Sequence, residues 1–200
     1  GVVSFSQSAE LEHQLSSDFN SIKDKLWTIE FEGRTNMQDA LSTARSELNS
    51  SRARSDSRKA IILLTDGLPN YTGSESTLIE CGPNSSGIYY SPGNDPTTHT
   101  GCTLAAIDEA HQLKNDLGYL IYTIGLGLNT IRDGYTQAHF DFVKTTLMPE
   151  LSSQPTLQFS KLIDTREKWG SPTELQNIYA QIFQNLTTNS IIKIVEKAPQ

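Results

Sequence analysis

Residues 59–69 contain the feature that most restricts how this chain can fold. Four large apolar residues, Ile61–Leu64, follow one another without a polar residue, and a turn sequence ending in Pro69 stops the run. A strand that is apolar on both faces is typical of a parallel sheet covered by helices on both sides. Asp66 directly follows the carboxyl end of this strand, the edge where open α/β sheets bind ligands. The same residue is equally suited to turning the chain before Gly67.

Strand patterns and helix patterns alternate along the rest of the chain. We expect strands or extended segments at 2–5, 11–15, 60–64, 119–124, 157–163 and 191–195. We expect helices behind Ser17 and at 37–48, 103–117, 140–149 and 172–186, the fourth ending near Pro149. This alternation predicts an α/β sheet.

Several residues are expected to fix the ends and faces of these helices. Asn36 and Ser17 are candidate N-caps, and Gly118 is expected to stop the helix before it. Ser171-Pro172-Thr173-Glu174 has the sequence of a capping box. The inward face of the 103–117 helix is expected to carry Leu104, Ile107, Ala110 and Leu113.

A long stretch from Leu68 to Gly101 shows no periodicity. Glycine, proline and asparagine occur throughout it, and the two cysteines of the chain, Cys81 and Cys102, bracket much of it. A loop of this length in a compact domain is usually functional, clamped or disordered.

Composition and charge exclude several classes of protein. The 200 residues allow one sizeable domain, and the net charge of −7 with scattered basic residues argues against nucleic-acid binding. No apolar run approaches the roughly 20 residues of a membrane span. The four histidines and two cysteines show no zinc-type or nucleophile-type spacing. Asp66 also follows a strand as in metal-dependent phosphohydrolases, but the second aspartate they require is replaced by Leu64, so we expect no enzyme.

Five segments, in order, resemble the von Willebrand factor type A family. Residues 1–6 resemble the family's second strand, and residues 33–41 resemble its threonine loop and the helix that follows. Residues 63–67 resemble its aspartate strand. Residues 121–127 resemble the next strand, and residues 175–186 resemble the final helix. The resemblance implies a doubly wound, mostly parallel sheet with helices on both faces. It also implies a domain over residues 1–187 with an irregular insertion at 68–101. Residues 188–200 would then be an extension or the start of a following segment.

The family's ligand site is a metal-ion-dependent adhesion site, which captures an acidic side chain of a partner protein. By position, the resemblance makes Thr35 the threonine ligand and Asp66 the aspartate ligand of a Mg²⁺ ion, which prefers hard oxygen donors. The family's Asp-x-Ser-x-Ser motif at the end of its first strand does not occur in this sequence.

The family's first strand lies between the strands represented here by Gly1–Phe5 and Ala60–Leu64. A sheet without it would leave two apolar strands with unpaired backbone groups, which is costly. We therefore expect an upstream part of the protein or a separate fragment to supply it; supply from Ile191–Val195 is the less favoured alternative.

The resemblance implies a non-enzymatic adhesion or assembly domain, extracellular or on the cell surface, that binds a protein presenting Asp or Glu. The alternative is a metal-free scaffold module of a secreted or pilus-associated protein that has lost the site. An extracellular setting also favours a disulfide between Cys81 and Cys102. The long loop leaves the strand directly after Asp66, so Tyr71, Tyr89 and Tyr90 are candidate partner contacts.

Overall fold

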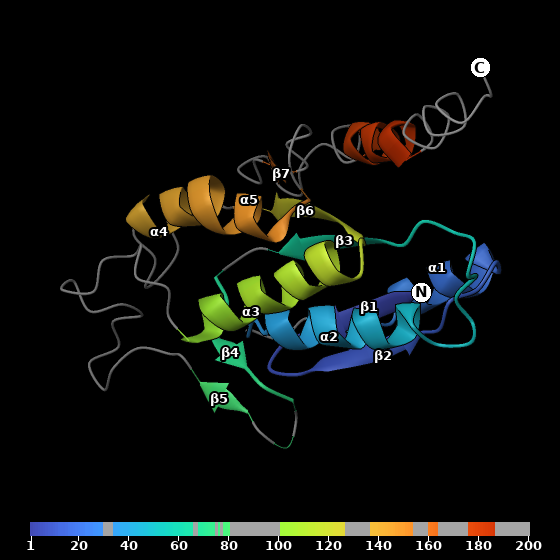
Figure 1. Cartoon of the computed structure of the whole chain (residues 1–200), viewed down its shortest axis with the longest axis horizontal. Coiled ribbons are helices and arrows are strands. Elements are labelled where there is room, and N and C mark those ends of the chain that lie inside the picture. Colours follow the sequence, from blue (N-terminus) through green and yellow to red (C-terminus); the bar gives the residue numbers. More distant parts are fainter. Residues whose placement is uncertain are drawn as a thin grey trace.

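The fold is organised around a parallel sheet with helices on both faces (Figure 1). The structure is a computed structural model and describes residues 1–29, 34–65, 68–74, 76, 78–80, 101–126, 137–153, 160–163 and 176–186. Its strands are β1 (Val2–Phe5), β2 (Ala9–His13), β3 (Ala60–Thr65), β4 (Tyr71–Thr72), β5 (Ile79–Glu80), β6 (Leu120–Leu126) and β7 (Ser160–Ile163). Its helices are α1 (Phe19–Leu26), α2 (Met37–Leu48), α3 (Gly101–His111), α4 (Gln137–Phe142) and α5 (Met148–Leu151). Two π-helical turns, η1 (Gln112–Asp116) and η2 (Val143–Leu147), follow α3 and α4, and residues 176–186 are also helical.

The central sheet has the strand order β3-β6-β7, and both pairings are parallel. Ala60 lies opposite Leu120 at one end of the β3–β6 ladder, and Thr65 lies opposite Gly125 at the other. The apolar run at Ile61–Leu64 is therefore a strand of a parallel sheet, as its sequence predicts.

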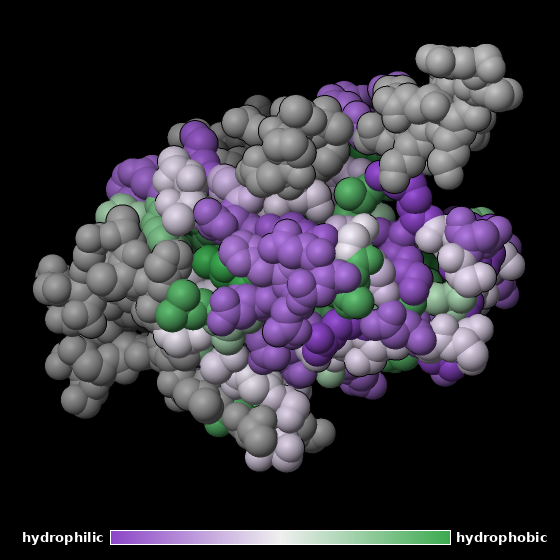
Figure 2. Space-filling view, viewed as in Figure 1, coloured by the Kyte–Doolittle hydropathy of each residue, from purple (hydrophilic) through white to green (hydrophobic). Residues whose placement is uncertain are grey.

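Two apolar clusters cover the two faces of this sheet. The larger one joins the sheet to α2, α3, η2 and α5, and its fully buried members include Leu41, Leu113, Ile121, Leu147, Met148 and Leu151. The smaller one packs Ile178 and Ile182 of the 176–186 helix against Tyr122 and Ile124 of β6. The outward side of α2 and α3 is mainly hydrophilic (Figure 2), as expected of helices that cover a core. None of the helices within the described ranges has the length and apolar character needed to cross a membrane.

The hairpin of β1 and β2 forms a separate antiparallel sheet. Within the described residues, no ladder of hydrogen bonds joins β1 to β3. In Figure 1, β2 and β3 run in opposite directions, so β1, which is antiparallel to β2, runs the same way as β3. Among the described residues, β1 and β3 therefore share a direction without being paired.

Four details of the sequence interpretation need correction. Asp18 rather than Ser17 caps α1, because its carboxylate accepts the backbone N–H groups of Asn20 and Ser21 at 3.1 Å each. Pro149 does not end its helix; it lies in the first turn of α5, where no hydrogen-bond donor is needed.

The other two corrections concern α3 and the loop before it. Leu104 does not face inward: it is 42% exposed, while small residues such as Ala106 and Ala110 occupy the buried face. The loop contains two short paired strands, β4 and β5, rather than irregular backbone alone. The predicted capping box at 171–174 and the predicted strand at 191–195 lie outside the described residues.

Candidate ligand site at the carboxyl edge of the sheet

Thr35 is held from both sides by the loop that follows β3. Its backbone N–H donates to Oδ1 of Asn70 at 2.8 Å. Its carbonyl oxygen accepts the N–H groups of Asn70 at 2.9 Å and Tyr71 at 3.2 Å. Thr35 is 8% exposed, so this threonine is a fixed part of the scaffold rather than a mobile loop residue.

Asn36 connects the same region to two further loops. Its Oδ1 accepts the N–H of Asp39 at 3.1 Å and so caps α2, as its sequence position predicts. Its Nδ2 donates to the carbonyl oxygens of Gln7 and Gly73, both at 2.9 Å. Its backbone N–H donates to the carbonyl oxygen of Ser6 at 2.8 Å. One fully buried side chain therefore joins three loops.

Two residues in the first turn of α2 complete this junction. Oε1 of Gln38 accepts the backbone N–H of Gly73 at 2.9 Å. Oδ2 of Asp39 accepts the backbone N–H of Ala9 at 2.7 Å. The loops at 6–9, 34–39 and 70–73 thus form one connected structure beyond the carboxyl ends of β1 and β3, which we call the edge junction.

The Thr35 hydroxyl fits the part of an oxygen ligand. It makes no hydrogen bond with the residues that the structure describes, so it is available to another group. Asp66 lies outside the described residues, between the described Thr65 and Leu68. Within the described ranges there is no group of three or more His, Cys, Asp or Glu side chains suited to a metal. Any further ligands would come from outside the described ranges, where Asp66 lies.

Of the other predicted site residues, the structure describes some and leaves others outside the described ranges. Tyr71 is 7% exposed, and the guanidinium of Arg34 lies 5.4 Å from its ring centroid, so this tyrosine offers a partner little surface. Tyr89 and Tyr90 lie outside the described residues, and their role stays a prediction.

Cys102 is fully buried at the start of α3 and is not a free thiol. Cys81 lies outside the described residues, so the pairing of the two also stays a prediction.

Sequence reasoning missed Asn70 and the bridging role of Asn36. Their contacts join residues 35 and 37 positions apart, which no local pattern encodes. The available signal was weak: an asparagine in each of two loops that a parallel sheet brings to the same edge.

Comparison with known proteins supports the architecture independently. Residues 1–68 match the family model described as von Willebrand factor type A domain. The vWF domain of the type V pili tip protein Mfa5 from Porphyromonas gingivalis is 16% identical, with a TM-score of 0.59 over 94% of this chain and 79% of that one. The pilus adhesin SpaC from Lactobacillus rhamnosus GG is 18% identical, with a TM-score of 0.56 over 86% of this chain.

A second SpaC structure, in the open conformation, gives 19% identity, a TM-score of 0.53 and coverage of 87% of this chain. This chain spans 22% of the length of SpaC in the first comparison and 21% in the second. Comparison with curated proteins gives no significant match. The structural likeness concerns the fold, and it confirms the α/β architecture that the sequence predicts.

Proposed function

We propose that this chain, which has the von Willebrand factor type A fold and matches that family's model over residues 1–68, is a non-enzymatic protein-binding domain. The observation that carries the proposal is the position of Thr35. Its hydroxyl, without a hydrogen bond in the described part of the chain, is held by a buried junction at the carboxyl edge of the sheet. A rigid polar group at this edge is suited to binding a ligand.

The proposed ligand is an acidic side chain of a partner protein, captured through a divalent cation. Thr35 and Asp66 would hold the cation, and Mg²⁺ suits a donor set made of oxygens. When bound, the cation would take a carboxylate oxygen of the partner as a further ligand. A site with one carboxylate and one hydroxyl from this chain binds weakly, so ligands from other polypeptide would strengthen it.

The structural neighbours guide the proposed setting. Mfa5 is described as a type V pili tip protein and SpaC as a pilus adhesin. We assign this chain the same kind of role, adhesion or assembly outside the cell. Tyr89 and Tyr90, in the loop that follows Asp66, would add contact area for the partner.

The test measures binding of the chain to a surface carrying immobilised glutamate side chains, in Mg²⁺ and in EDTA. The net charge of −7 disfavours non-specific attraction to such a surface. Thr35→Ala and Asp66→Ala should each weaken the Mg²⁺-dependent binding at least about tenfold. Circular dichroism should remain unchanged, because the Thr35 hydroxyl bonds to nothing in the described structure.

Thr28→Ala and Asp108→Ala are the matched controls, since both residues are exposed and lie away from the edge junction, in the turn after α1 and on α3. Binding that depends on Mg²⁺ but survives both site substitutions would refute the assigned ligands. Binding that is the same in Mg²⁺ and EDTA would favour the metal-free scaffold instead.

A further inference from the structure

Residues 50–59, which join α2 to β3 and which we call the basic loop, concentrate positive charge in an acidic chain. They include a single acid, Asp56, and four of the 16 lysines and arginines of the chain: Arg52, Arg54, Arg58 and Lys59. The basic loop precedes the amino end of β3, whereas the edge junction lies beyond the carboxyl end. In Figure 1 it is the teal segment at the end of the molecule away from β4. A ligand of the basic loop would therefore leave the edge junction open.

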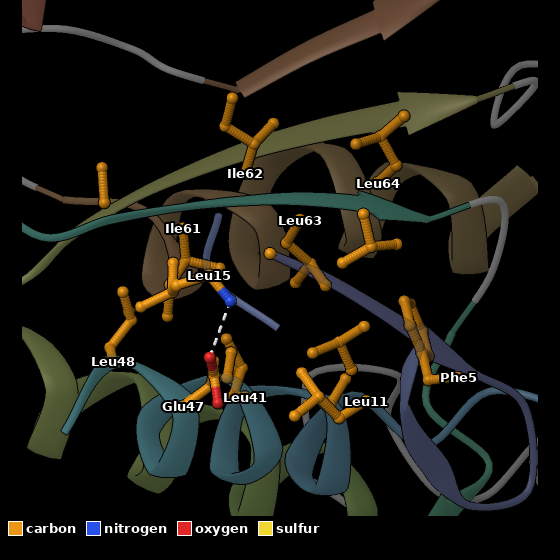
Figure 3. A pocket seen from close by; sticks show the side chains of 16 residues that line it. Phe5, Leu11, Leu15, Leu41, Glu47, Leu48, Ile61, Ile62, Leu63 and Leu64 are labelled. Atoms are coloured by element: carbon orange, nitrogen blue, oxygen red, sulfur yellow. Dashed lines mark hydrogen bonds between the residues drawn. The ribbon is translucent and has the colours of Figure 1, made fainter. Parts of the chain in front are cut away.

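The first part of the basic loop is fixed by Glu47, at the end of α2. Arg52 donates from Nε to Oε1 of Glu47 at 3.0 Å and from Nη2 to Oε2 at 2.6 Å. Figure 3 shows that the Glu47 carboxylate also accepts the backbone N–H of Leu15, at 2.7 Å. The charge of Arg52 is therefore matched, and its side chain holds the loop against the helix.

The last part of the basic loop is fixed by Tyr119, which precedes β6. Nζ of Lys59 donates to the Tyr119 hydroxyl at 3.2 Å and lies 5.1 Å from the ring centroid. Tyr119 is buried, and its hydroxyl donates to Oδ1 of Asn49. Because the loop is held at both ends, binding a ligand costs less conformational entropy than ordering a mobile loop would.

A tight turn between these anchors presents two further arginines. The backbone N–H and the hydroxyl of Ser57 both donate to the carbonyl oxygen of Arg54, at 3.4 and 2.9 Å. Such a turn brings its first and fourth residues within about 7 Å of each other, so Arg54 and Arg58 leave the chain at the two ends of one turn. Both residues are exposed, and neither forms an ion pair with a described residue, Asp56 included. Two unmatched guanidinium groups thus stand side by side in sequence on a fixed loop.

The composition of the basic loop indicates which anion it fits. Guanidinium groups bind carboxylate, phosphate and sulfate groups through paired hydrogen bonds. The loop has no aromatic or large aliphatic side chain, which a protein partner needs as an anchor and a single-stranded nucleic acid needs for stacking. Besides its charges it offers Ala53 and four hydroxyl groups, those of Ser50, Ser51, Ser55 and Ser57. A short, arginine-rich and otherwise polar segment is suited to a sulfated polysaccharide.

We propose that the basic loop binds a sulfated polysaccharide, with Arg54 and Arg58 as the contacts to its sulfate groups. Arg52 and Lys59 position the loop, and the serine hydroxyls supply hydrogen bonds to the polymer. The inference does not depend on the proposed cation site, because none of these residues belongs to the edge junction. A domain with both surfaces can hold a protein and a polysaccharide at the same time.

The test measures binding of fluorescently labelled heparin, a highly sulfated polysaccharide, to the full chain by anisotropy. The buffer contains EDTA, which removes any divalent cation from the edge junction. We expect saturable binding that weakens about tenfold as the NaCl concentration rises from about 50 to about 200 mM, the dependence produced by about two released counterions. Heparin from which the sulfate groups have been removed should not compete. Binding should be the same in Mg²⁺ as in EDTA.

Two variants locate the binding to the turn. Arg54→Ala and Arg58→Ala should each weaken heparin binding about threefold, and the double variant should weaken it about tenfold. Circular dichroism should stay unchanged, because neither side chain makes a hydrogen bond or ion pair with a described residue. Lys144→Ala is the matched control: it removes one exposed positive charge from η2 and should bind as the parent does.

Other ligands give distinct results, and each would overturn the proposal. Polyglutamate that binds as tightly as heparin would identify an acidic protein segment as the ligand. Equal competition by double-stranded DNA would show a general attraction to polyanions. Absence of saturable heparin binding, or binding that the double variant retains, would refute the assigned arginines. None of these results alters the Mg²⁺-dependent binding to immobilised glutamate, so the two proposals fail separately.

Discussion

Asn36 illustrates how one residue determines the shape of the edge junction. Its fully buried amide caps α2 with its oxygen and bridges two other loops with its nitrogen. Asn36→Ala should lower the free energy of unfolding by about 2–4 kcal/mol, since it removes a cap and two further hydrogen bonds. Urea denaturation measures this change.

The Asn36→Asp variant separates the two functions. It keeps an oxygen for the cap but cannot donate to Gln7 or Gly73, so it should also be destabilised. Asn20→Ala, at an exposed position of α1, should change stability by no more than about 0.5 kcal/mol. An Asn36→Asp variant as stable as the parent would show that the bridges contribute little.

Glu47 is a buried carboxylate whose hydrogen bonds make the free energy of unfolding depend on pH. Its carboxylate accepts Arg52 at 2.6 and 3.0 Å and the N–H of Leu15 at 2.7 Å. The hydrogen bonds from Arg52, supported by that from Leu15, hold the pKa of Glu47 below its ordinary value of 4.5. The folded state therefore binds this proton less readily than the unfolded state does.

Stability from Glu47 is consequently present above pH 4.5 and is lost as the pH falls through the lower folded-state pKa. The parent should be more stable than Glu47→Gln at pH 7, and the difference should shrink below pH 4.5. Thermal unfolding from pH 7 to pH 3 measures it, with exposed Glu10→Gln as the control. A difference that is constant across this range would contradict the assignment.

At the scale of elements, the start of α3 carries one of the two cysteines of the predicted disulfide. Cys102 is fully buried there, and Cys81 is the other cysteine of the chain. If the two are paired, reduction should lower the free energy of unfolding by roughly 3 kcal/mol in the chain-entropy model. Intact mass with and without reductant identifies the bond, and denaturation measures its effect.

The double variant Cys81→Ser with Cys102→Ala supplies the control for this experiment. Its stability should be lower than that of the oxidised parent and insensitive to reductant. Two free thiols in native material would disprove the bond.

The elements themselves were largely predictable, because apolar periodicity and caps act locally. The strand at Ile61–Leu64 and the cap at Asn36 follow from a few adjacent residues. Leu104 was misplaced because the buried face of α3 is set by its neighbours: small residues face α2 and α5, which no local pattern reveals. Pro149 was misjudged because a preceding π-helical turn lets a new helix begin at that point.

At the scale of the molecule, the sequence predicted the parallel sheet that the structure shows. Thr35 was correctly expected before a capped helix, and the structure adds how it is fixed. The contacts of Asn70 could not be predicted, because they depend on how three loops meet after the sheet has formed. Such long-range contacts are a property of the assembled fold rather than of any segment.

The separation of the β1–β2 hairpin from the central sheet, within the described residues, bears on the cooperativity of folding. The β1–β2 hairpin and the β3-β6-β7 sheet are joined through α2 and its flanking loops rather than by a continuous ladder. Units joined in this way can open with different free energies. A ligand that bridges them binds only when both are folded, and at 100 times its dissociation constant it adds about 2.7 kcal/mol to stability. A ligand that contacts both units, such as one bound at the edge junction, would thus couple the opening of one to that of the other.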